Sequence, residues 1–91
     1  MDLDLKNVVS FPNGEYAFVS TYSYHDMATY PEYIYKTTIF KCDKDGKVKD
    51  WSDYLYYQKY NSKYDATAEH ERIVDIASES DSIKDYIYYL N

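Results

Sequence analysis

Two β-prone segments joined by a turn stand near the start of the chain, where residues 8–24 read VVSFPNGEYAFVSTYSY. Asn13-Gly14 between apolar runs is a strong hairpin signal, because both residue types tolerate positive φ. In the second arm the large rings, including Phe18 and Tyr22, alternate with small or β-branched residues such as Val19. Both faces of this arm carry bulky or β-branched side chains, so we expect it to be a central strand.

Residues 34–42 have the strongest β propensity of the chain, with β-branched and aromatic residues throughout. They are followed by Asp43-Lys44-Asp45-Gly46, which fits a type I turn closed by a glycine bulge. We expect residues 47–51 to return as the partner strand, and residues 54–57 to form one further strand. Residues 25–33, which contain Pro31, are predicted to be a loop.

The hydrophobic period changes to that of a helix after residue 61. Ser62 with Asp65 three residues later resembles a capping box, and a helix is predicted from there to about residue 78. A second cap at residues 80–82 precedes the segment 83–90, which fits a helix better than the alternative, a strand. The apolar stripe of the first helix consists of Ala66, His70, Ile73 and Ala77.

The order of these elements predicts one α+β domain spanning residues 1–91. An antiparallel meander of three to five strands would pack against a C-terminal amphipathic helix, with a second short helix after it. Ile, Leu, Val and Phe together supply only 18 of 91 residues, whereas 14 are tyrosines. Tyrosine rings must therefore fill much of the core, and the margin of stability should be small.

Charge and cysteine content narrow the functional classes. The formal net charge is -6, and the basic middle of the chain (+3 over residues 34–63) lies between acidic ends (-4 and -5). Direct nucleic-acid binding is disfavoured, because phosphate contacts call for a net basic surface. The sequence contains neither an export signal nor a membrane span, and its single cysteine, Cys42, suits a reducing compartment. We expect a cytoplasmic protein.

No combination of residues predicts catalysis, a cofactor or a metal. The segment around Gly46 is out of register for an EF-hand, which needs acidic ligands at fixed positions before and after the glycine. His25 and His70 lack the companion ligands of a zinc site, and His70 fits a hydrogen-bonded, semi-buried residue. Cys42 fits a small core residue of a strand. We expect no enzymatic activity.

Two features predict a surface that binds a partner. So many tyrosines cannot all turn inward in a domain this small, and exposed tyrosine is favoured in recognition surfaces. Three acids recur every four residues on one helix face, about 6 Å apart, which is close to the phosphate spacing of a nucleic-acid strand. An ordinary solvated helix face is the alternative reading of that acidic row. The predicted contact residues are Tyr22, Tyr24, Tyr30, Tyr33, Tyr56, Tyr57, Glu71, Asp75 and Glu79.

Residues 37–74 resemble a pattern found in small uncharacterised proteins of tailed bacteriophages. The chain departs from that pattern at Lys36, where glutamate is usual, and at Glu69, where glycine is usual. The resemblance implies a phage or prophage origin and carries no catalytic residue. The matching residues are Thr37, Phe40, Cys42, Asp43, Gly46, Val48, Asp50, Trp51, Leu55, Tyr60, Ala66, His70 and Val74.

Together these features predict a phage-encoded, non-enzymatic protein that inhibits a bacterial host or defence protein by steric occlusion. The tyrosines would anchor the contact, and the acidic row would steer the protein towards a nuclease or another protein with a basic cleft, as a nucleic-acid mimic does. The alternative is a virion assembly or accessory protein that self-associates, for example as a homodimer, through the same rings or an unpaired strand edge. Neither hypothesis involves a membrane.

Overall fold

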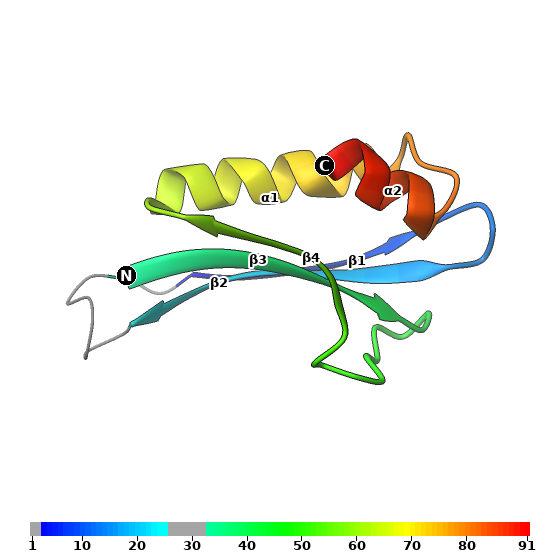
Figure 1. The fold of residues 1–91 in the computed structure, drawn as a ribbon, viewed down its shortest axis with the longest axis horizontal. Coiled ribbons are helices and arrows are strands. Elements are labelled where there is room, and N and C mark those ends of the chain that lie inside the picture. Colours follow the sequence, from blue (N-terminus) through cyan, green and yellow to red (C-terminus); the bar gives the residue numbers. More distant parts are fainter. Residues whose placement is uncertain (1–2, 26–32) are drawn as a thin grey trace.

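The computed structural model describes residues 3–25 and 33–91, which form an antiparallel sheet followed by two helices. The strands are β1 (Asp4–Ser10), β2 (Tyr16–His25), β3 (Tyr33–Cys42) and β4 (Tyr54–Tyr60), and they lie side by side in chain order. The helices α1 (Lys63–Ala77) and α2 (Ile83–Leu90) lie on the same side of the sheet (Figure 1). The predicted α+β meander is therefore confirmed, with β2 in a central position as expected.

A glycine at positive φ closes both tight turns. In the β1–β2 turn, Gly14 (φ 88°) donates its N–H to the carbonyl of Phe11 at 3.0 Å. After β3, Gly46 (φ 83°) donates in the same way to Asp43 at 3.0 Å. Positive φ was expected at Asn13 as well, but no described residue other than glycine has it. The turn needs only one left-handed residue, and glycine takes it without steric cost.

The prediction that residues 47–51 form the partner of β3 is wrong. Val48 makes a single bridge to Cys42, after which the chain leaves the sheet. The Asp50 carboxylate accepts hydrogen bonds from the Ser52 N–H (2.9 Å) and hydroxyl (2.6 Å), which stabilises a bend there. The strand that pairs with β3 is β4, with a register shift between Ile39 and Phe40.

Serine caps begin both helices, as predicted. The Ser62 hydroxyl accepts from the N–H of Asp65 at 3.1 Å, and Ser82 accepts from Asp85 at 3.2 Å. Such caps satisfy backbone donors that have no partner within the helix. The final segment is thus a helix rather than a strand. Residues 26–32 of the predicted loop lie outside the described residues.

The hydrophobic core lies between the sheet and the two helices. Val19 and Ile39 of the central strands meet Ile73 of α1, and none of the three has exposed surface. Tyr86 of α2 completes this core with a ring 5.2 Å from that of Phe11 and a hydroxyl that donates to the Ile73 carbonyl at 2.7 Å. A tyrosine therefore fills the centre, as the shortage of aliphatic residues required.

Candidate partner-binding surface

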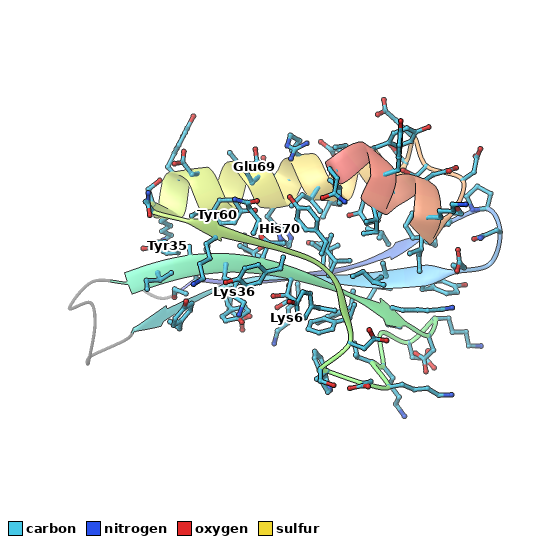
Figure 2. The ribbon with its side chains drawn as sticks, in the orientation of Figure 1. Lys6, Tyr35, Lys36, Tyr60, Glu69 and His70 are labelled. Atoms are coloured by element: carbon cyan, nitrogen blue, oxygen red, sulfur yellow. The ribbon has the colours of Figure 1, made fainter. Side chains whose placement is uncertain are left out.

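The sheet has one face covered by the helices and one that they leave bare. Because side chains alternate along a strand, Thr21 and Thr37 point towards α1, whereas their neighbours Tyr22 and Lys36 point away from it. Figure 2 shows His70 between the sheet and α1, with Lys36 on the opposite side. We call this second side the open face. Its members on the four strands include Asp4, Lys6, Val8, Phe18, Ser20, Tyr22, Tyr24, Lys36, Thr38, Phe40, Tyr54, Tyr57 and Lys59.

The β3–β4 connection folds back beneath one end of the open face (Figure 1). A Cβ on Gly46 would lie 3.0 Å from the Val8 side chain, so the connection reaches as far as β1. The Trp51 ring stands edge-on against Phe18 (centroids 5.8 Å apart) and Phe40 (5.0 Å). Even so, 61% of Trp51 stays exposed. The connection thus holds a large ring at the border of the open face.

Lysine side chains lie among the tyrosines at the other end of the open face. The Lys36 Nζ is 4.7 Å from the Tyr57 ring centroid and 5.9 Å from that of Tyr22, so the rings attract the ammonium through their negative faces. The Lys59 Nζ lies 5.9 Å from the centroid of the same Tyr57 ring. Its pKa is raised, chiefly by its hydrogen bond with the Tyr57 hydroxyl, so it stays charged at neutral pH.

A hollow of about 440 Å³ opens between these two ends. The cross-strand register explains it, because the small residues Ser20 and Thr38 lie opposite each other in a row flanked by rows of larger side chains. The volume falls within the range of ligand-sized pockets. The lining residues are Tyr22, Lys36, Thr38, Phe40, Trp51, Tyr54 and Tyr57.

The structure brings together only some of the residues predicted to contact a partner. Tyr22, Tyr24 and Tyr57 share the open face, and the ring centroids of Tyr22 and Tyr24 are 6.3 Å apart. Tyr56, predicted to belong to the same surface, lies on the other side of β4, half-buried against the core, and is therefore not part of the open face. Tyr30 and the Tyr33 side chain lie outside the described part.

The acidic row and the tyrosines do not form one surface. Glu71 and Asp75 are exposed on α1, and Glu79, predicted on the same helix face, is exposed in the turn just after the helix ends at Ala77. All three belong to the helical layer, whereas the tyrosine cluster is on the far side of the sheet. A partner that covers the open face therefore meets lysines rather than this row. This separation was not predictable from the sequence, because the charge counted along the chain does not say which face carries it. Sequence reasoning also missed Lys36, Thr38, Phe40, Trp51 and Tyr54, which line the hollow.

His70 is buried and fully hydrogen-bonded, as predicted. Its Nε2 lies 2.7 Å from the Asn7 Oδ1, which can only accept, so Nε2 carries the proton. The neutral Nδ1 then accepts from the Thr21 hydroxyl at 2.7 Å. Thr37 in turn donates to Thr21, and Tyr60 donates to Thr37 at 3.2 Å. Every polar side chain in this series of hydrogen bonds has a partner, and the series connects α1 with all four strands. This arrangement indicates a structural role for His70.

The described residues show neither a metal site nor a membrane-spanning helix. No group of three or more His, Cys, Asp or Glu side chains among residues 3–25 and 33–91 is placed to hold a metal ion. Neither α1 nor α2, the helices of the described part, has the length and apolar character needed to cross a bilayer. Comparison with family models, with curated proteins and with solved structures finds no match to this chain.

Proposed function

We propose that this chain is a non-enzymatic binding protein that docks on a partner protein through the open face. The observation that supports the proposal is the combination of Trp51, Tyr54, Tyr57 and Lys36 on a sheet face that no described helix covers. Tyrosine and tryptophan supply most of the binding energy at protein interfaces, because they bury large rigid areas at little entropic cost. The rings also surround a hollow, which suits the insertion of a partner side chain.

The partner proposed for this face has an acidic contact surface. Lys36 and Lys59 project from adjacent strands, and neither forms an ion pair within the described residues. Lys6 is paired with Asp4 at 3.5 Å, so the strand part of the face keeps a positive balance. Complementary charge steers association and selects the partner. The resemblance to phage proteins suggests a bacterial host protein as the partner, and steric inhibition as the effect.

We expect the isolated chain to be a monomer in sedimentation experiments, even at high concentration. Two open faces brought together would place the lysines of one copy against those of the other. Lys6 and Lys59 also lie on the two edge strands, where charged side chains oppose edge-to-edge pairing. A stable dimer that persists in high salt would contradict this expectation and favour the assembly hypothesis.

The docking proposal is tested by affinity capture from bacterial lysate with matched variants as bait. In the double variant Trp51→Ser/Tyr57→Ser, two exposed rings of the open face are removed. A protein retained by the natural chain should be lost from this bait, because two aromatic anchors contribute about 2 kcal/mol or more each. The control, Tyr64→Ser/Tyr88→Ser, removes rings that are 81% and 77% exposed on the helices, and it should retain the partner.

A third bait separates the two surfaces that the sequence suggested. In Glu71→Gln/Asp75→Asn/Glu79→Gln the acidic row is neutral while the open face is intact. If this bait loses the partner and the ring-deleted bait keeps it, the partner binds the helical layer and the proposal is wrong. Thermal unfolding of each bait verifies that it is folded.

A further inference from the structure

The hollow contains a polar group that lacks a partner. Thr38 is 5% exposed, and its Oγ1 is the only buried side-chain nitrogen or oxygen of the described residues without a hydrogen bond. Its neighbour Thr37, on the other face of the same strand, is bonded to both Thr21 and Tyr60. Buried hydroxyls are normally paired, because an unpaired one loses its bonds to water without replacement. The lack of a partner is therefore confined to the hollow.

A second donor lies on the wall of the same hollow. Lys36 lines it together with Thr38, and the rings of Tyr22 and Tyr57 hold the ammonium in place. Because these two rings contact the ammonium through their faces, neither tyrosine hydroxyl accepts a hydrogen bond from it. Its N–H groups remain able to donate to a ligand. A pre-positioned side chain loses little rotamer entropy when it binds. The hollow thus has an ammonium on its wall and, at the buried Thr38 that also lines it, a hydroxyl without a partner.

The group that matches both donors is a carboxylate. It carries only acceptors, has room for several hydrogen bonds, and neutralises the charge of Lys36. We propose that the hollow anchors an aspartate or glutamate side chain of the partner protein, with Lys36 and Thr38 as its ligands. This inference rests on the proposed docking function and names its specific contact.

The fluorescence of Trp51 can be used to measure binding in the hollow without a label. Trp51 lines the hollow and is the single tryptophan of the sequence, so its fluorescence reports occupancy. The probe is a capped tetrapeptide that alternates glutamate with phenylalanine, and its control replaces each glutamate with glutamine. We expect the acidic peptide to change Trp51 emission and to shift the amide resonances of Ser20 and Thr38. Its affinity should exceed that of the control about tenfold and fall as salt is added.

Three variants assign the contact. Lys36→Gln should weaken the acidic peptide about tenfold and remove its advantage over the glutamine control. Lys84→Gln, at an exposed lysine of α2, should leave both affinities unchanged. Thr38→Val keeps the shape of the side chain but lacks the hydroxyl. It should weaken binding while raising the thermal midpoint of unfolding, because it removes an unpaired buried group. A purely structural threonine would not couple these two opposite effects.

The outcomes separate this inference from the docking proposal. Equal affinities for the two peptides, absence of binding by either, or an unchanged affinity in Lys36→Gln would each overturn the carboxylate anchor. If the partner from the lysate is lost with Trp51→Ser/Tyr57→Ser yet retained by Lys36→Gln and Thr38→Val, the open face is the docking surface and only the anchor is wrong. Loss of the partner with all three variants supports both.

Discussion

Replacing Tyr86 with alanine is expected to lower the free energy of unfolding by about 3–5 kcal/mol, the usual effect of deleting a buried aromatic side chain. Tyr86 has no exposed surface, packs against Phe11, and donates its hydroxyl hydrogen to the Ile73 carbonyl. Burial also raises the pKa of its hydroxyl, so the phenol stays neutral and acts as a donor. A chain of this length has roughly 5–14 kcal/mol of total stability, so the loss is a large share.

Urea unfolding followed by circular dichroism measures this effect. The matched control is Tyr89→Ala on the same helix, where the ring is 54% exposed and the change should stay within about 0.5 kcal/mol. Tyr86→Phe keeps the ring and should lose about 1 kcal/mol, since only the hydrogen bond is removed. A loss below about 1 kcal/mol for Tyr86→Ala would show that tyrosine rings do not hold this core together.

The parts of the fold that follow from local chemistry were predictable from sequence. Ser62 and Ser82 have the side chains that satisfy free N–H groups at a helix start, and Gly14 and Gly46 stand where a turn needs positive φ. Each signal depends on a few neighbouring residues. The strand predicted over residues 54–57 is confirmed by β4, but its pairing with β3 was not predictable in this way. The turn at Asp43–Gly46 favours an immediate return, but contacts with distant residues draw residue 51 out of the sheet plane.

The open face was the least predictable part of the molecule. Alternation in β2 separated its two sets of side chains correctly, but it does not say which set a helix will cover. Thr37 and Thr38 show most clearly what the sequence does not predict, because these adjacent, identical residues lie in different environments. Thr37 meets Thr21 and Tyr60 on the covered side, whereas Thr38 faces the hollow. Only the packing of α1 on one face creates that difference.

The core holds only some of the tyrosines, as predicted, but the positions of the remaining ones were only partly predicted. Of the described tyrosines, just three are buried, Tyr35, Tyr60 and Tyr86, so the core does not absorb the rest. The predicted surface included Tyr56, which packs inward, and it combined the tyrosines with an acidic row that belongs to the other layer. Spacing along the sequence groups residues by proximity in the chain, whereas a docking surface is assembled across strands.

We expect the free energy of unfolding to fall when the pH is lowered, because His70 is buried as a neutral side chain. Burial lowers the pKa of His70 below its ordinary value, and the nearby Glu71 carboxylate offsets this only in part. The folded chain therefore keeps His70 neutral at a pH where the unfolded chain, with a pKa of about 6.5, binds a proton. Stability is complete above about pH 6.5 and falls as the pH drops towards the folded-state pKa, by at most about 1.4 kcal/mol per pH unit.

The donor and acceptor roles in the hydrogen bonds of His70 explain why its protonation should lower stability. The Asn7 oxygen already fixes one proton on Nε2, so a second proton must sit on Nδ1, where Thr21 now donates. The hydroxyls of Thr21, Thr37 and Tyr60 would then all have to reverse, and Tyr60 would need a new acceptor. Protonation thus disrupts a chain of bonds that crosses the sheet.

Urea unfolding between pH 7.5 and 5.5 tests this contribution against His70→Gln, whose amide offers one donor and one acceptor but does not titrate. We expect the natural chain to lose more stability than the variant over this range, by at most about 1.4 kcal/mol per pH unit, since all other titratable groups are the same in both. Parallel pH profiles would mean that His70 accepts its proton without penalty, and that the hydroxyl chain reverses freely. A steeper fall in the natural protein would tie its acid stability to the hydrogen-bond network that joins all four strands to α1.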